Sequence, residues 1–317
     1  AVGMAEIVYA EVCYQRNDCF AAITTLVGSI PFIEKKGEIA VLFVALSLQM
    51  KIMIATGQIA VVYPMLDQIY QRLYAGKSRW LFENFSALRA KGMLYDGDVH
   101  TILQWMKNEA PNELGELCML DTYKYMVKMR AYILEEKYLA AISLSEYLKK
   151  PLQQGGRVMD LCEIELLCAI SYFLDGNPAE AYTILDSILP IIEERRFDRL
   201  VADEGEKVYF LLRNYKKERQ SDRAYLDQLI LLAKRMALLY PDYLRRPKED
   251  YQPLTETEQE ILCLMEDERS NNEIAEFMDV SINTVKFHIK NIYTKLNARS
   301  RQQALRIAKE NKLITLR

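Results

Sequence analysis

The chain has 317 residues, of which half are apolar, and a formal net charge of −3. This length predicts about two domains with substantial cores, and the near-neutral balance gives no overall attraction to a polyanion. The longest apolar stretches, such as 39–55, are interrupted by polar residues and are too short to cross a bilayer. Residues 1–10 also lack the basic start and apolar run of a signal peptide. We therefore expect a cytoplasmic protein without membrane contact.

The cysteines and histidines argue against a metal centre. The six cysteines form no Cys-x-x-Cys pair, and the only two histidines, His100 and His288, stand far apart in the sequence. Reduced, buried thiols are the expected interpretation in a cytoplasmic protein. No nucleophile or carboxylate constellation surrounds His100 in the sequence. We therefore expect no metal, no cofactor and no enzyme activity.

Helical periodicity extends over about the first three quarters of the chain, without a convincing period-2 strand. Turn signals between the helices recur in steps of 40, 40, 39 and 40 residues, at Asn17, Gly57, Gly97, Glu136 and Gly176. Glycine or asparagine at a helix end tolerates the left-handed backbone that closes the helix. Because one helical hairpin cannot bury its apolar face alone, repeated hairpins are expected to stack into an α-solenoid. The predicted repeat domain covers residues 1–240.

The repeat is longer than the 34 residues of a tetratricopeptide repeat. It resembles the tetratricopeptide-like repeats of about 40 residues in the superhelical domain of MalT-type regulators. Residues 195–215 also resemble the segment that closes that domain, with Asp203, Glu204 and Gly205 matching its Asp-Glu-Gly element. The resemblance covers residues 5–240 and implies a domain that receives an inducer, either a small molecule or a protein.

Tyrosine is abundant in the chain, with 20 residues that by spacing belong mostly to the core. A few aromatic residues are candidates for lining a concave ligand groove in the repeat domain: Tyr9, Tyr14, Trp80, Tyr123 and Tyr125.

A proline-rich segment at 241–253 leaves little room for a helix and is the predicted linker. Beyond it, residues 254–317 carry sharp helix-start signals. Thr255 with Glu258, and Ser270 with Glu273, have the spacing of capping boxes. Two further serines, Ser281 and Ser300, can cap the third and fourth of four short helices. The second and third helices are separated only by about 279–281, which indicates a helix-turn-helix.

Charge reverses sign within this second domain. Residues 250–280 contain ten acidic residues and one basic residue, whereas residues 281–317 contain nine basic residues and one acidic residue. A solvated surface typically mixes the two signs. A surface that binds phosphates needs cations, because each neutralised phosphate releases counterions. The segregation therefore favours contact with nucleic acid.

Residues 254–305 are similar to the LuxR-type helix-turn-helix. The family motif is present in order as Leu254, Thr255, Glu258, Asn271, Ile274, Ala275, Ser281, Thr284, Val285, Lys286, His288, Ile292, Tyr293, Lys295, Leu296, Arg299, Ser300 and Arg301. Two positions depart from the pattern: Thr257 stands where an arginine is usual, and Glu268 where a glycine is usual. Neither position is on the third helix, which the resemblance identifies as the recognition helix.

The resemblance implies that the N-terminal half of the third helix enters the major groove. In this family, side chains at the positions that here hold Lys286, Phe287 and Lys290 typically point at base edges. Lysine suits guanine O6 or N7, and phenylalanine suits a thymine methyl group. Four other side chains are better suited to phosphates, which position the protein without specifying sequence: Ser281, Thr284, Lys295 and Arg301.

The same helix also predicts a packed face. Val285, Ile289, Ile292 and Leu296 follow one another at spacings of 4, 3 and 4 and are expected in the core. His288 lies next to this stripe and is expected to pack rather than to read a base. The alternative to base reading is that Lys286 and Lys290 are only solvated by water and that Phe287 packs in the core.

Together these features predict an all-α protein in which an α-solenoid of helical hairpins precedes a four-helix LuxR-type domain at 254–317. The expected function is a bacterial, sequence-specific DNA-binding transcriptional regulator, with an activator favoured. Its expected partners are double-stranded DNA, an inducer and a second copy on DNA, with RNA polymerase as a further candidate. The alternative is an interaction scaffold whose solenoid binds a peptide or protein and whose C-terminal domain does not read DNA.

MalT-like proteins carry a P-loop ATPase ahead of the superhelix, and no P-loop occurs in these 317 residues. Two interpretations follow from that comparison. The chain is either the C-terminal part of a longer protein or a shortened relative that is regulated without ATP.

Overall fold

The computed structural model describes residues 2–76, 78–113, 118, 121–245, 254–267, 269–296, 298, 300, 301, 304, 305 and 308. These residues form helices and turns, and no strand occurs among them. The predicted all-α fold is therefore confirmed. The chain divides into two compact units, Ala1–Arg246 and Pro247–Arg317, which are described separately.

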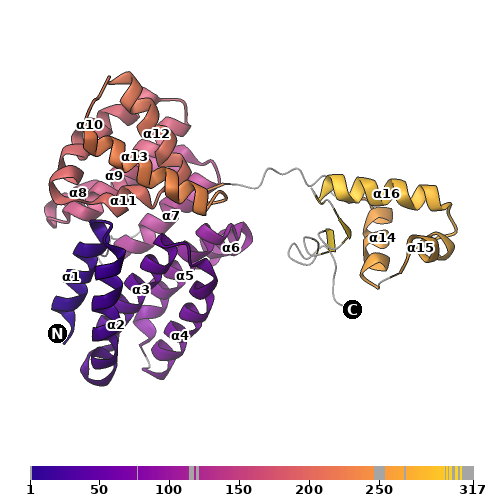
Figure 1. Ribbon diagram of the computed structural model, residues 1–317, viewed down its shortest axis with the longest axis horizontal. Helices are drawn as coiled ribbons and strands as arrows, with labels where there is room; N and C mark the ends of the chain where they lie inside the picture. The colour runs from indigo at the N-terminus through magenta and orange to yellow at the C-terminus, as the bar shows by residue number, and fades with distance from the viewer. Residues whose placement is uncertain are drawn as a thin grey trace. The chain divides into compact units, whose positions relative to one another are not determined.

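The first unit is built from antiparallel helix pairs (Figure 1). The first helices of the five successive hairpins are α1 (Met4–Gln15), α3 (Ile39–Ala55), α5 (Phe82–Asp96), α7 (Thr122–Leu134) and α9 (Val158–Leu174). Their partners are α2 (Cys19–Lys36), α4 (Val62–Ala75), α6 (Val99–Asn108), α8 (Tyr138–Gln154) and α10 (Pro178–Arg195). Short 3-10 turns, η1 (Ile59–Val61) and η2 (Arg79–Leu81), precede α4 and α5. The unit closes with α11 (Asp198–Ala202), α12 (Gly205–Glu218) and α13 (Ala224–Leu239).

The hairpin turns have the backbone that the repeat spacing predicts. The five residues at these turns all have positive φ: 62° at Asn17, 82° at Gly57, 72° at Gly97, 60° at Glu136 and 84° at Gly176. Left-handed backbone ends a helix and reverses the chain. The 40-residue repeat in sequence is therefore a repeat of helical hairpins in structure.

The array curls so that α1 lies against α11. The backbone N–H of Leu200 donates to the Gln15 side-chain oxygen at 3.1 Å. The packed core also continues beyond residue 240, where we placed the end of the repeat domain, because Tyr243 and Leu244 are buried in it. The predicted linker is 241–253, and most of it, residues 246–253, lies outside the described residues.

The second unit contains α14 (Glu256–Glu266), α15 (Asn271–Phe277) and α16 (Ile282–Lys295) around a separate apolar core. The turn between α15 and α16 includes Asp279 at φ 53°. The predicted fourth helix lies largely outside the described residues, as do Glu268, Arg299 and Ile307. Two residues of that segment, Ala304 and Ala308, are buried in the core of this unit.

Candidate nucleic-acid interface

Both predicted capping boxes form and fix the starts of α14 and α15. The Thr255 backbone N–H donates to Glu258 Oε2 at 2.8 Å, and the Glu258 N–H donates to Thr255 Oγ1 at 3.3 Å. Ser270 and Glu273 make the same reciprocal bonds at 2.6 and 3.3 Å. Such boxes satisfy backbone donors that a helix start otherwise leaves open. They position the two helices that support α16.

The start of α16 is organised by Ser281 and Thr284. Ser281 Oγ accepts from the Thr284 backbone N–H at 3.2 Å, and the two hydroxyl oxygens lie 2.8 Å apart. The first turn of α16 has no acidic residue. A helix N-terminus carries partial positive charge and free N–H donors, which suit a phosphate. Both hydroxyls predicted to hold phosphates therefore lie at an end of the helix that attracts anions.

The inner face of α16 packs as predicted. Val285, Ile289, Ile292 and Leu296 are all buried among residues of α14 and α15. His288 is half-buried beside them, and its Nδ1 atom is buried without a hydrogen-bond partner among the described residues. The Phe287 ring meets the His288 ring edge-on, with centroids 5.7 Å apart. This packing fixes which side of α16 faces outward.

The outward side of α16 carries Asn283, Lys286, Phe287 and Lys290, hereafter the outer stripe. All four side chains are exposed, with Phe287 at 61%. Their spacing of 3, 1 and 3 places them on one face of the helix. Neither lysine forms an ion pair with a residue that the structure describes. The alternative that Phe287 belongs to the core is wrong, since its ring lies in solvent.

Lys295 has a partner inside the unit. Its Nζ donates to Glu258 Oε2 at 2.6 Å, and Glu258 is only 2% exposed. Burial acts to raise the pKa of Glu258, but the hydrogen bonds from Lys295 and from the Thr255 N–H outweigh burial and lower it. Lys295 thus neutralises a buried carboxylate, which differs from the phosphate contact that we predicted.

Arg301 is also engaged within the unit. Its Nη2 donates to the carbonyl oxygens of Met265 at 3.0 Å and Arg269 at 2.5 Å, at and just beyond the end of α14. Cationic side chains at a helix C-terminus satisfy open carbonyls and stabilise the helix dipole. Arg301 and Lys295 thus both have partners within the unit, and their predicted phosphate contacts stay predictions.

Sequence reasoning missed one member of the outer stripe, Asn283. The signal was available, because position 283 lies one helical turn before Lys286 and shares its face. An asparagine side chain both donates and accepts hydrogen bonds, which suits the edge of an adenine.

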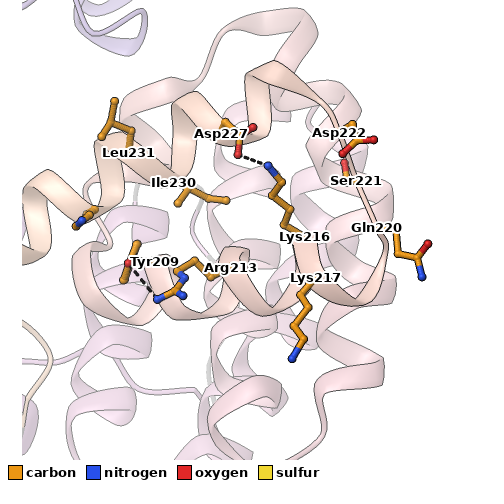
Figure 2. Close-up of a pocket in the computed structure, with 11 residues that line it drawn as sticks. Tyr209, Arg213, Lys216, Lys217, Gln220, Ser221, Asp222, Asp227, Ile230 and Leu231 are labelled. Atoms are coloured by element: carbon orange, nitrogen blue, oxygen red, sulfur yellow. Dashed lines mark hydrogen bonds and ion pairs between the residues drawn. The ribbon is translucent and has the colours of Figure 1, made fainter.

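The first unit also presents an open groove with a cavity volume of about 740 Å³ between α12 and α13 (Figure 2). Within it, the Lys216 ammonium pairs with Asp227 at 2.5 Å, and Arg213 Nη1 donates to the Tyr209 hydroxyl at 3.3 Å. Basic residues outnumber acidic ones in its lining, so we call it the cationic groove; it is lined by Tyr209, Arg213, Lys216, Lys217, Gln220, Ser221, Asp222, Asp227, Ile230, Leu231 and Lys234.

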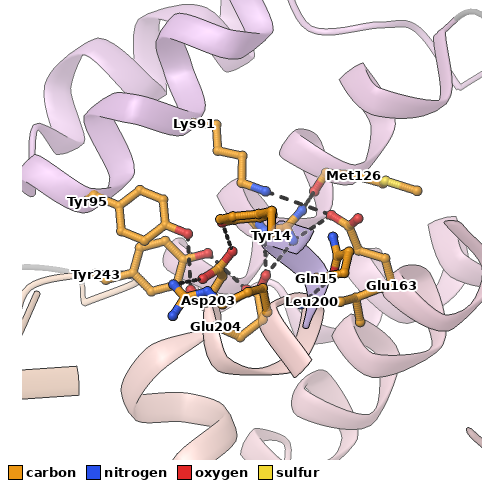
Figure 3. Close-up of polar contacts among 12 residues, drawn as sticks. Tyr14, Gln15, Lys91, Tyr95, Met126, Glu163, Leu200, Asp203, Glu204 and Tyr243 are labelled. Atoms are coloured by element: carbon orange, nitrogen blue, oxygen red, sulfur yellow. Dashed lines mark hydrogen bonds and ion pairs between the residues drawn. The ribbon is translucent and has the colours of Figure 1, made fainter. Parts of the chain in front are cut away.

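The interior of the first unit holds ion pairs between side chains that are buried or half-buried (Figure 3). Arg130 donates through Nε to Glu204 Oε1 at 3.1 Å and through Nη2 to Glu163 Oε1 at 2.7 Å. The Glu204 carboxylate also accepts from the Tyr243 hydroxyl at 2.9 Å. Asp203, next in the chain, accepts from Arg199 and from the Tyr14 hydroxyl. We call the five ionised residues the central ion network: Arg130, Glu163, Arg199, Asp203 and Glu204.

The five aromatic candidates for a ligand groove do not gather at one place. Tyr9 and Trp80 are exposed, at 58% and 61%. Tyr125 is buried, and its hydroxyl donates to the Asn112 carbonyl at 2.8 Å. Tyr14 and Tyr123, in contrast, line the same small recess next to the central ion network.

Two features are absent from the part of the chain that the structure describes. No helix there is long and apolar enough to span a membrane. No group of three or more histidine, cysteine, aspartate or glutamate side chains there is arranged to hold a metal ion.

The chain combines a helical-repeat array with a capped helix-turn-helix whose second helix carries exposed lysines. These features define the class of helix-turn-helix proteins with a helical-repeat domain. Residues 1–218 match the family described as "MalT-like TPR region", and residues 252–308 match "Bacterial regulatory proteins, luxR family". The chain belongs to the MalT-like TPR family and carries a luxR-family domain at its C-terminal end.

Individual relatives agree with this assignment. The chain is 44% identical over 64 residues to the transcriptional regulatory protein LiaR of Bacillus subtilis (strain 168), which is 20% of this chain and 30% of LiaR. It is 29% identical over 143 residues to the HTH-type transcriptional regulators MalT of Yersinia pestis (strain Pestoides F) and Yersinia pseudotuberculosis (serotype O:1b, strain IP 31758). These matches cover 44% of this chain and 14% of either MalT. The chain thus spans a minor part of the length of these relatives.

Proposed function

We propose that this chain is a sequence-specific, DNA-binding transcriptional regulator whose outer stripe on α16 reads the major groove. The observation that carries the proposal is the division of α16 into a buried apolar face and an exposed face with two lysines that have no ionic partner among the described residues. A helix presented in this way, after a tight turn from a supporting helix, matches the docking geometry of a helix-turn-helix.

Each side chain of the outer stripe has a chemical role in this proposal. Lys286 and Lys290 donate to guanine O6 or N7, and Asn283 pairs with an adenine edge. Phe287, whose ring is 61% exposed, contacts a thymine methyl group. Ser281 and Thr284, at the N-terminus of α16, position the helix on a phosphate.

The remaining partners follow from the family and stay proposals. The repeat unit receives an inducer, either a small molecule or a protein, and two copies bind DNA together as a homodimer or larger oligomer in the cytoplasm. RNA polymerase is a further candidate partner, with activation of transcription as the favoured outcome. The printed names of LiaR and MalT, both regulators of transcription, support this interpretation.

The test is a binding titration with the Lys286→Ala/Lys290→Ala double variant. The preferred duplex is first selected by the unmodified chain from random DNA, and a scrambled duplex serves as reference. At fixed salt, loss of two base contacts is expected to reduce discrimination by about 2–6 kcal/mol, at about 1–3 kcal/mol for each contact. Binding to the scrambled duplex is expected to weaken much less.

The matched control is Lys217→Ala/Lys234→Ala, which removes the same charge from the cationic groove of the first unit. This control is expected to keep full discrimination. If the α16 variant discriminates as well as the unmodified chain, the assignment of the outer stripe to base reading is wrong.

The cationic groove is the observation that favours the second candidate function, an interaction scaffold that binds an acidic peptide or protein. Three basic residues in the lining, Arg213, Lys217 and Lys234, have no ion-pair partner among the described residues. The two functions separate in one competition experiment. A DNA reader prefers its selected duplex to a poly-glutamate peptide of equal charge, whereas a scaffold shows the reverse preference.

A further inference from the structure

Charge is segregated within the first unit as well as within the second. Residues 205–239, which form α12, α13 and the turn between them, contain eight basic and four acidic residues. Residues 1–204 contain 20 basic and 27 acidic residues, so the rest of the unit is acidic. A solvated surface typically mixes the two signs. The last two helices of the first unit therefore present a cationic surface on a chain whose net charge is −3.

The cationic groove between α12 and α13 collects the unpaired part of this charge. Arg213 and Lys217 lie one helical turn apart on α12, and Lys234 lines the same groove from α13. All three side chains are exposed, and none forms an ion pair with a residue that the structure describes. Arg213 donates to the Tyr209 hydroxyl at 3.3 Å, but this neutral partner leaves its charge uncompensated.

The acidic side chains in the lining do not cancel these charges. Asp227 of α13 pairs with Lys216 of α12 at 2.5 Å, so this ion pair joins the two helices and is neutral as a whole (Figure 2). The other acid of the lining is Asp222, in the turn between the helices. Three open cations thus face one remaining carboxylate. The groove keeps a net positive charge that an anionic partner can neutralise.

We propose that the cationic groove binds the phosphate backbone of the DNA that flanks the site read by α16. Phosphate oxygens accept strong, charge-assisted hydrogen bonds from Arg213, Lys217 and Lys234. The groove is open to solvent and has a cavity volume of about 740 Å³, so it can hold part of a strand that continues beyond it. Such a contact adds affinity and positions the protein without reading sequence. This role rests on the function proposed above.

The covalent link between the units favours DNA over an acidic protein as the occupant. Both units belong to one chain, and residues 246–253 are all that separates the described residues of the first from those of the second. DNA held by α16 is therefore present at a high effective concentration for the first unit, so a weak second contact still raises the total affinity. A free acidic protein has no such advantage. Duplex DNA is stiff over about 150 base pairs, so it continues past α16 on both sides.

The test compares two duplexes that share the selected site. One ends at the site, and the other has about 20 base pairs of added DNA on each side, about 70 Å at 3.4 Å per base pair. The full chain is titrated with each duplex at several salt concentrations. The long duplex is expected to bind more tightly and with a steeper salt dependence. Each additional neutralised phosphate steepens the slope of log K against log salt by about 0.9.

The Lys217→Ala/Lys234→Ala variant removes two of the three open cations. On the long duplex its salt slope is expected to be shallower than that of the unmodified chain by about 2, with weaker binding. On the short duplex both quantities are expected to stay unchanged. Since phosphates carry no sequence information, selected and scrambled long duplexes are expected to weaken equally. Lys217→Glu/Lys234→Glu, which reverses the charge, is expected to abolish the gain from the added DNA.

The matched control is Lys107→Ala/Lys150→Ala, which removes the same charge from exposed positions on α6 and α8. This control is expected to leave the salt slope and the effect of duplex length unchanged. The proposal is wrong if the unmodified chain binds the long duplex no better than the short one. It is equally wrong if the groove variant and the control variant lose the same affinity for the long duplex.

An acidic protein as the occupant would give a different result. The groove variant would then lose affinity for a poly-glutamate peptide and keep the unmodified salt slope on the long duplex, which overturns the proposal. The function proposed above has a separate readout, the discrimination between selected and scrambled duplexes by Lys286→Ala/Lys290→Ala. If that variant loses discrimination and added DNA has no effect, the proposed function stands and this inference fails. If that variant keeps discrimination while the groove variant behaves as expected, the assignment of base reading fails and the backbone contact stands.

Discussion

In the first unit the side chains of Arg130 and Glu204 are each only 1% exposed and bind one another, whereas in the second unit Lys286 and Lys290 lie in solvent without an ionic partner among the described residues. Buried ions hold residues that are far apart in sequence at fixed positions, since an unpaired ion is costly there. Exposed, unpaired cations are free to bind a polyanion. The comparison indicates that charged side chains give structural order in the first unit, whereas in the second unit they leave a surface open to the DNA binding proposed above.

The largest expected effect comes from breaking the central ion network with Arg130→Met. This change leaves Glu204 buried with the Tyr243 hydroxyl as its one remaining side-chain partner among the described residues, and leaves Glu163 without its closest cation. Removing one partner of a buried ion pair costs about 3–5 kcal/mol. Both tryptophans, Trp80 and Trp105, lie in the first unit. Urea unfolding followed by tryptophan fluorescence therefore reports the free energy of unfolding of this unit.

The matched control is Arg219→Met, which breaks an exposed ion pair of 2.7 Å with Asp186 in the same unit. An exposed pair contributes about 0–1 kcal/mol. The contrast between the two units would lose its basis if both arginine variants unfolded at the same urea concentration.

A smaller loss of stability is expected from Lys295→Met in the second unit, because the Glu258 carboxylate, which loses its ion-pair partner, keeps other hydrogen bonds. Glu258 would lose its cation but retain the hydrogen bond from the Thr255 N–H at 2.8 Å. A buried acceptor that loses a bond costs about 1–3 kcal/mol. Hydrogen exchange of the amides in α14 and α16, measured by mass spectrometry at pH 7, follows the local stability.

The pH dependence of this variant has a definite sign. In the unmodified chain the folded-state pKa of Glu258 is lowered, so its contribution is present above the ordinary value of 4.5 and is lost as pH falls through the lowered value. In the variant, loss of the hydrogen bond and charge of Lys295 is expected to raise that pKa above its value in the unmodified chain. The stability difference between the two proteins is therefore expected to shrink as the pH falls from 7 to 3. A difference that stays constant over this range would show that Lys295 acts through packing alone.

Local features of both units could be predicted from sequence, and contacts between distant segments could not. The hairpin turns, such as Gly57 and Gly97, and the capping boxes depend on neighbouring residues and were predicted in place. The bond from Tyr14 to Asp203 joins residues 189 positions apart, and a single sequence contains no signal for it. The same limit explains Lys295, whose charge pattern suited a phosphate while its partner lies 37 residues earlier.

The smallest expected effect concerns one of these predictable features, the cap of α15. Ser270→Ala removes the oxygen that accepts from the Glu273 N–H, and loss of such a cap costs about 1 kcal/mol. Ser270→Gly is the matched control, since glycine at this position costs only a few tenths of a kcal/mol. Because α15 has only seven residues and supports α16, Ser270→Ala is expected to speed hydrogen exchange in both helices and to leave exchange in the first unit unchanged. Equal exchange in the alanine and glycine variants would mean that apolar packing, rather than the cap, holds the supporting helix in place.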